Sequence, residues 1–315
     1  MAELYFSDEG ALRRYKAKRI CIKFFLYAFL TLFALFMLLP FVLMIIGSLT
    51  EAKSFDNFEQ TADFSFLGFR NWSFGNFEQI FSGKVVNTIT GEVTQTTSFA
   101  QFYLNTIISA VGSTSVTVVT AVLAAFAFAR LEFKGKNVLF ASLLATMMIP
   151  GELMVLTNYQ TTKVIGWENT FSALIFVHGV SVFYVFYLRQ TFQQIPNELY
   201  LAAKVDGVGD VGYLWKVMVP IAMPTITTII ILSLMGAWNS YVWPMLVANG
   251  SWKYSDGYDM RLVSTGLMSL FNTQAKGMSA IKIAGSMVVT FPLFVTFIIF
   301  RKYIMRGVSR SGIKG

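Results

Sequence analysis

The chain has 315 residues, of which 55% are apolar and only 13% are charged. That charged fraction is about half the level of a soluble domain, so the composition excludes an ordinary soluble protein and indicates a membrane protein. The net charge of +8 does not indicate nucleic-acid binding, because the basic residues gather before the first apolar segment and after the last, where they face anionic lipid.

Six apolar segments are long enough to cross a membrane as helices, which takes about 20 residues each. They are residues 24–49, 104–129, 138–160, 171–191, 215–234 and 280–300. We therefore predict an all-α membrane protein, with residues 24–300 forming one six-span domain.

The basic residues also predict the orientation. With both termini in the cytoplasm, the inner segments carry 17 Lys and Arg, and the outer segments carry seven over much longer loops. Such an excess marks the cytoplasmic side. We therefore expect cytoplasmic tails at 1–23 and 301–315 and outer loops at 50–101 and 247–278.

The first outer loop contains a Val- and Thr-rich stretch that suggests a β-hairpin at Thr90-Gly91. The second outer loop is about thirty residues long, and a loop of that length in a compact domain is usually functional.

The second span carries a polar stripe at four-residue spacing, which places its members on one slowly drifting helix face. Its members are Asn105, Ser109, Ser113 and Thr117. Small hydroxyl residues often serve close helix packing. The alternative is that the stripe forms a wall of a polar pathway.

The third and fourth spans each contain a polar residue that needs an explanation. Glu152 follows Pro150-Gly151, and an intramembrane carboxylate is either functional or placed at a helix break that water reaches. His178 is the only histidine, and we expect it to be a hydrogen-bonded packing residue.

The sequence contains few residues or motifs that could form a catalytic, metal or nucleotide site. One histidine and one cysteine, Cys21, exclude a His/Cys metal cluster and an intrachain disulfide. No P-loop motif occurs. We predict no catalytic residue, no metal site and no cofactor bound by this chain.

The inner segment at 195–214 is too polar for lipid and reads as a short, well-delimited helix. Pro196 cannot lie inside a helix, and Asn197 is a suitable N-cap. Glu198 would then lie at the positive end of the helix dipole. Gly207 can adopt the left-handed conformation that ends a helix, and Asp210 can cap a second helix.

Within this predicted helix, Ala202 and Ala203 leave a bare patch that a partner surface can approach closely. The fifth span ends in Trp238, Asn239 and Tyr241. These aromatic residues fit an interfacial belt, but rings beside an amide also suit a sugar, whose C–H faces stack on rings.

Together these segments resemble the permease subunits of ATP-binding-cassette importers that depend on an extracytoplasmic binding protein, most closely the maltose/lactose/multiple-sugar branch. Residues 195–207 and the prolines Pro220 and Pro224 are similar to that family's EAA loop. Further matching strings are Met148-Ile-Pro150-Gly151, Ala237-Trp-Asn239 with Pro244, and Arg306 to Gly315. The resemblance extends over nearly all of 105–315.

The resemblance implies that the inner helix couples this chain to a cytoplasmic ATPase dimer, which binds ATP and Mg²⁺. It also implies a second homologous permease subunit, an extracytoplasmic solute-binding protein and a place in the cytoplasmic membrane of a bacterium. The coupling residues would be Glu198, Leu201, Ala202, Ala203, Asp206 and Gly207. The candidate substrate pathway would be Asn105, Ser109, Glu152, Trp238, Asn239 and Tyr241. Leu201 departs from the family, which has glutamate at this position.

Three alternatives remain. A permease of the same superfamily could carry another small solute such as glycerol phosphate, an amino acid or a polyamine, although a single pathway carboxylate disfavours the polyamine. A secondary transporter should show ion-coupling residues or paired broken helices. A membrane enzyme should show a nucleophile with its base, or a metal site.

Overall fold

The computed structural model describes residues 9–51, 54–55, 72–87, 91–95, 98–272 and 278–309. Parts of both outer loops and of both tails, including the Gly-Ile-Lys-Gly end, lie outside these residues. The helices are α1 (Glu9–Leu49), α3 (Gly75–Ser82), α4 (Phe99–Arg130), α5 (Lys136–Thr146), α6 (Gly151–Val164), α7 (Phe171–Phe176), α8 (Val182–Gln193), α9 (Asn197–Val205), α10 (Asp210–Tyr213), α11 (Val219–Trp238), α12 (Val242–Val247), α13 (Val263–Asn272) and α14 (Ser279–Ser309).

Helices dominate the described chain, and four of them are long and apolar enough to cross a membrane. They lie within Ala17–Leu49, Phe99–Arg130, Asp210–Trp238 and Ser279–Arg301. A fifth candidate is the pair α5 and α6, which is bent by 95°. The prediction of an all-α membrane protein is therefore confirmed in outline, but two of the six predicted spans are not continuous helices.

The third predicted span, 138–160, breaks between α5 and α6. Pro150 precedes α6 with φ −58° and ψ 128°, and its missing N–H together with its restriction of Ile149 prevents a continuous helix. Glu152 lies in the first turn of α6, beside this break, and is exposed.

The fourth predicted span, 171–191, breaks between α7 and α8. Gly179 lies in the break, where an added Cβ would lie 2.6 Å from Cγ1 of Val116. The hydroxyl of Thr120 donates to the Gly179 carbonyl at 2.8 Å. The chain thus leaves the helical path where α4 comes close, and α4 satisfies one of the freed carbonyls.

A hairpin is present in the first outer loop, as predicted, although Thr90 of the expected turn lies outside the described residues. β1 (Lys84–Val86) pairs antiparallel with β2 (Val93–Gln95), with Val85 opposite Thr94. Gly91 has φ 70°, a conformation that glycine adopts without strain.

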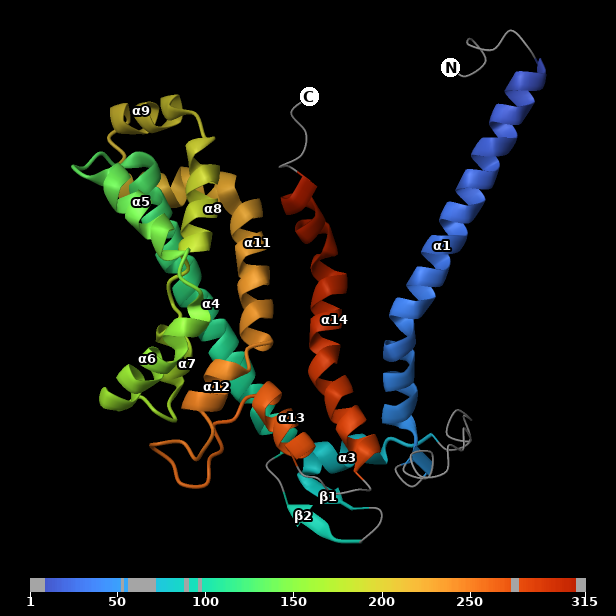
Figure 1. The fold of residues 1–315 in the computed structure, drawn as a ribbon. Coiled ribbons are helices and arrows are strands. Elements are labelled where there is room, and N and C mark those ends of the chain that lie inside the picture. The colour runs from blue at the N-terminus through green and yellow to red at the C-terminus, as the bar shows by residue number, and fades with distance from the viewer. Residues whose placement is uncertain are drawn as a thin grey trace.

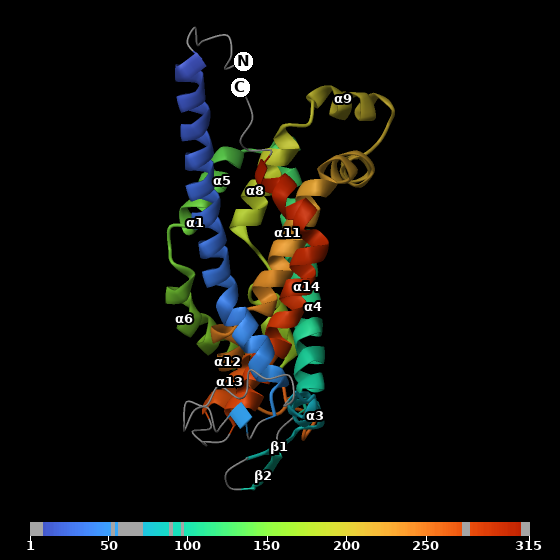
Figure 2. The same cartoon turned by 90° about the vertical axis from the view of Figure 1, so that its right-hand side faces the viewer.

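Figures 1 and 2 show α9 at the same end of the helical bundle as the N-terminal end of α1 and the C-terminal end of α14. The hairpin, α3 and α13 lie at the opposite end (Figure 1). The largest buried cluster lies toward the α9 end, where α4, α8 and α11 meet; it includes Phe126, Leu188, Phe192, Leu214 and Ile229.

Candidate functional site: an inner docking helix and a hydroxyl-lined pocket

The inner helix α9 ends in a Schellman motif. Gly207 has φ +73°, its N–H donates to the Lys204 carbonyl at 3.1 Å, and the N–H of Val208 donates to the Ala203 carbonyl at 2.8 Å. These two bonds satisfy carbonyls that a helix end leaves free. The predicted helix and its glycine end are confirmed.

The predicted caps at the starts of the two inner helices are wrong. Asn197 is the first residue of α9, after Pro196, and it makes no capping bond. Asp210 is the first residue of α10, after Gly209, and also makes none. Instead, Asp210 Oδ1 accepts a bond from the Tyr200 hydroxyl at 2.6 Å and lies 2.7 Å from Lys204 Nζ. Asp210 therefore ties α9 to the foot of the next span.

The hydrogen bonds to Asp210 stabilise the protonated forms of Tyr200 and Lys204. The bond to the Asp210 carboxylate raises the pKa of the Tyr200 hydroxyl and the pKa of the Lys204 ammonium above their ordinary values. Both sides of the Lys204–Asp210 pair are 40% exposed, so solvent weakens the attraction between them.

Arg130, the last residue of α4, fastens the segment that precedes α9. Its guanidinium donates to the carbonyls of Phe192, at 2.9 Å, and Ile195. In the other direction, Arg189 Nε of α8 donates to the Phe128 carbonyl of α4 at 3.1 Å. The two arginines therefore bind α4 and α8 reciprocally beneath α9.

The faces of α9 differ sharply. Tyr200 and Ala203 pack against the buried cluster of α4, α8 and α11. Five of the six predicted coupling residues are exposed: Glu198, Leu201 and Ala202 on the opposite face, and Asp206 and Gly207 directly after the helix ends. Ala203 is half-buried, so the expected bare patch consists of Ala202 alone.

Joining α10 to α11 is a π-helical turn, Leu214–Met218. Such turns are rare and occur frequently at functional sites. Pro220 and Pro224 follow in the first two turns of α11. The foot of this span is therefore irregular just where it meets α9.

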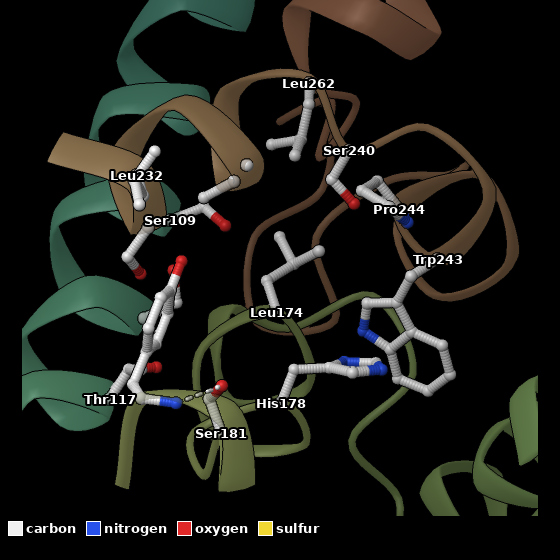
Figure 3. Close-up of a pocket in the computed structure, with 15 residues that line it drawn as sticks. Ser109, Thr117, Leu174, His178, Ser181, Leu232, Ser240, Trp243, Pro244 and Leu262 are labelled. Carbon is white, nitrogen blue, oxygen red and sulfur yellow. Dashed lines mark hydrogen bonds between the residues drawn. The ribbon is translucent and has the colours of Figure 1, made fainter. Parts of the chain in front are cut away.

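A second feature is a pocket of about 230 Å³ between α4, the α7–α8 break, α11 and α12 (Figure 3). Hydroxyl groups and three aromatic side chains line much of it. The polar and aromatic lining residues are Ser109, Ser113, Thr117, His178, Ser181, Tyr184, Ser233, Ser240 and Trp243.

The rings of His178 and Trp243 meet edge to face, with centroids 4.9 Å apart. The indole of Trp243 donates to the Ala173 carbonyl at 3.0 Å, which fixes its plane. His178 lies beside Ser181, which caps α8, and Trp243 lies on the other side of the imidazole (Figure 3).

Only part of the predicted pathway set lines this pocket. Ser109 does, whereas Glu152, Trp238, Asn239 and Tyr241 do not. Trp238 instead donates to the Val289 carbonyl at 3.1 Å. Asn239 bonds the Met235 carbonyl of its own helix at 3.0 Å. The role of these residues in transport stays a prediction.

Asn105 is also absent from the pocket lining. It is fully buried and holds the second outer loop: Nδ2 donates to the carbonyls of Asp259 and Arg261 at 2.7 and 3.0 Å, and Oδ1 accepts from the Tyr258 hydroxyl at 2.6 Å. Only the rest of its stripe, Ser109, Ser113 and Thr117, faces the pocket.

Sequence reasoning missed several pocket residues. His178 was expected to be a hydrogen-bonded packing residue, yet its imidazole makes no hydrogen bond to any residue that the structure describes. Ser181 and Tyr184 lie just after the break, which a continuous span did not anticipate. The signal that could have found them is Gly179, a residue that favours a break inside an apolar segment.

No cluster of His, Cys, Asp and Glu suited to a metal ion occurs among the described residues. The site therefore consists of a docking helix at one end of the bundle and a hydroxyl-lined pocket within it.

Comparisons with known proteins agree with this architecture. Residues 117–310 match the family described as binding-protein-dependent transport system inner membrane component. The arabinooligosaccharides transport system permease protein AraQ of Halalkalibacterium halodurans is 32% identical over 60% of this chain and 65% of that protein, just under two thirds of its length. AraQ of Bacillus subtilis is 25% identical over 91% of this chain and 94% of that protein.

A solved structure shares the fold. A bacterial ABC transporter involved in the import of the acidic polysaccharide alginate superposes with a TM-score of 0.72 at 19% identity, over 91% of this chain and 97% of that chain. Since the family match covers more than half of the chain, this protein belongs to the inner membrane components of binding-protein-dependent transport systems.

Proposed function

We propose that this chain is the permease subunit of an ATP-driven importer and that α9 docks on a cytoplasmic ATPase. The single observation that carries the proposal is α9 itself, a short helix fastened to the bundle on one face and exposed on the other. In this orientation both termini lie in the cytoplasm, and the chain crosses the membrane six times, with α5–α6 and α7–α8 as broken spans.

The exposed face of α9 indicates the chemistry of the ATPase surface. Leu201 is 56% exposed and Val205, one turn further on, is 87% exposed. Glu198 lies in the first turn of the same helix. An ATPase cleft that is apolar at its centre, with a basic group opposite Glu198, would complement this face. ATP and Mg²⁺ would be bound by that partner and not by this chain.

Rigidity is the property that such a contact needs, because a flexible connector would dissipate the motion of the ATPase. The Schellman end, the Asp210 bonds and the Arg130 bonds supply it.

A second permease subunit is proposed on two observations. The apolar residues of α1 are exposed along nearly its whole length. The pocket is also smaller than the about 300–1,000 Å³ of most ligand sites. Both fit a chain that forms half of a pathway.

The solute that we propose is a sugar or an oligosaccharide. The names of the relatives support it, since the AraQ proteins are named for arabinooligosaccharides and YtcP of Bacillus subtilis for polygalacturonan and rhamnogalacturonan. A solute-binding protein would deliver it to the outer end, where Asn105 holds the second outer loop. Another small solute, such as glycerol phosphate, is the alternative.

A matched pair of substitutions tests the docking role. Val205 on α9 and Val164 at the end of α6 are equally exposed, at 87% each, and lie at opposite ends of the bundle (Figure 1). We expect Val205→Asp to lose the co-purifying ATPase and ATP-dependent uptake, and Val164→Asp to keep the ATPase. Normal ATPase capture and uptake by Val205→Asp would refute the proposal.

A further inference from the structure

We propose that the hydroxyl-lined pocket selects uncharged saccharide units and excludes acidic ones. This inference rests on the proposed function, since it takes the pocket as part of the solute path. It adds a selectivity that belongs to the membrane chain and is separate from the choice made by the solute-binding protein.

The first observation is the number of polar groups that the fold leaves without a partner. Among the residues that the structure describes, no hydrogen bond is made by the hydroxyls of Ser109, Thr117, Tyr184 and Ser240 or by the imidazole of His178. Ser109 and Thr117 are also buried, at 6% and 4% exposure. Their oxygen atoms are not sealed off, because the only fully buried side-chain polar atoms without a partner among the described residues are Arg130 Nε and the Tyr213 hydroxyl. The Ser109 and Thr117 hydroxyls are therefore open to the pocket that they line. Groups that converge on one pocket without such partners are suited to a ligand rich in donors and acceptors.

The second observation is the absence of fixed charge. None of the 15 lining residues is Asp, Glu, Lys or Arg. A carboxylate that entered would lose its hydration without gaining a counter-charge, which is unfavourable for an ion. A hydroxymethyl group in the same place would only exchange water for the protein hydroxyls.

The third observation concerns shape. Trp243 is held by its bond to Ala173 and presents its ring beside His178 (Figure 3). Together with Leu174 and Leu262, these rings make up the apolar wall of the pocket, and Ser109 lies across the pocket from Trp243 (Figure 3). A sugar ring offers the complementary pair of surfaces, with C–H faces for the wall and hydroxyls for the serines.

A set of thiol reagents with the same reactive group and different charges tests the selectivity without knowledge of the natural sugar. Cys21 is the only cysteine, so Ser240→Cys in a Cys21→Ser background places a single thiol in the pocket. Exposed Ser255, as Ser255→Cys, provides the matched control outside it. The whole importer in nanodiscs is treated with hydroxyethyl, sulfonatoethyl and trimethylammonioethyl methanethiosulfonate, and modification of this chain is followed by mass spectrometry.

Relative to the Ser255→Cys control, we expect the neutral reagent to modify Ser240→Cys about tenfold faster, or more, than the anionic reagent. Equal relative rates for both would overturn the inference, and so would a pocket thiol that no reagent reaches. Uptake by the Cys21→Ser importer, measured in parallel, shows whether the proposed function stands independently of that result.

A charge insertion provides the second arm. Gly236 lines the pocket, and a Cβ added there meets nothing within 4 Å, so Gly236→Lys has room and Gly236→Met is its uncharged control. We expect Gly236→Lys, and not Gly236→Met, to raise the anionic rate at Ser240→Cys about tenfold. An unchanged anionic rate in Gly236→Lys would contradict a pocket whose selectivity comes from missing charge.

The saccharide part is tested by protection of the Ser240→Cys thiol. The probes are galactose with galacturonate and glucose with glucuronate, two pairs that differ only at the sixth carbon. We expect the neutral member of each pair to slow labelling by the hydroxyethyl reagent more than the acid does. Stronger protection by the acids, or no protection by any of the four, would overturn this part.

Discussion

The two ends of the bundle hold their connecting segments in opposite ways. At the α9 end, the polar contact between Lys204 and Asp210 is 40% exposed on both sides, and apolar packing of Tyr200 and Ala203 completes the attachment. At the other end, the amide of Asn105 is fully buried and makes three hydrogen bonds to the second outer loop.

The difference shows where polar contacts matter. An exposed ion pair is worth about 0–1 kcal/mol, whereas a buried amide leaves several groups unsatisfied when it is removed. We infer that the outer loop depends chiefly on buried polar contacts, above all those of Asn105, and that α9 itself depends on packing and on backbone conformation, while Arg130 holds the segment before it. Four substitutions test this contrast, from the largest expected effect to the smallest.

Replacing Asn105 should have the largest effect. Asn105→Ala leaves the Arg261 carbonyl and the Tyr258 hydroxyl without the bonds that Asn105 gives them, and it removes one of the two donors to the Asp259 carbonyl, to which Gln101 still donates at 3.1 Å. It should cost about 3 kcal/mol. The measurement is the melting temperature of the purified complex. Asn239→Ala is the control, because this exposed amide only bonds its own helix. Equal melting temperatures for the two variants would contradict the contrast.

A glycine of α13 should rank second. A Cβ at Gly266 would lie 2.3 Å from the ring of Phe102, which is 2% exposed. Gly266→Ala should therefore cost about 2 kcal/mol through overpacking between α13 and α4. Gly151, where a Cβ would meet nothing within 4 Å, provides the control as Gly151→Ala. Thermal unfolding compares them, and a Gly266→Ala protein as stable as wild type would show that α13 shifts freely.

The glycine that ends α9 should rank third in stability but carry a large functional effect. Gly207→Ala places a side chain at φ +73°, which costs about 1 kcal/mol. Gly209→Ala is the matched control, since Gly209 has φ −70° and open space around it. We expect ATP-dependent uptake to fall in Gly207→Ala and not in Gly209→Ala. Wild-type uptake in Gly207→Ala would show that the Schellman end does not matter for coupling.

Removing the exposed ion pair should have the smallest effect. Lys204→Met should change stability by less than about 1 kcal/mol, and that change should shrink as salt is added. The Tyr200 hydroxyl still bonds Asp210 in this variant. Unfolding at low and high salt is the measurement, and a loss as large as that of Asn105→Ala would reverse the comparison.

The sequence predicted the helical class, the short inner helix and its glycine end, because each depends on local signals such as Pro196, Gly207 and long apolar runs. It did not predict the break at Gly179, which depends on the close approach of Val116 from another helix. Asn105 and Ser109 share one polar stripe, yet one binds a loop and the other lines the pocket. That division is set by tertiary contacts that periodicity does not reveal.

Pro292 of α14 has a consequence for how force spreads through the bundle. A proline withholds the N–H that would have bonded the carbonyl four residues earlier, here Val288, and the Tyr103 hydroxyl of α4 takes that carbonyl instead. Trp238 of α11 binds the adjacent Val289 carbonyl. Three membrane helices are thus fastened at one level, far from α9 (Figure 1). A force delivered at α9 would then tilt these three helices together, with their contacts at that level kept in place, and would not slide them past one another.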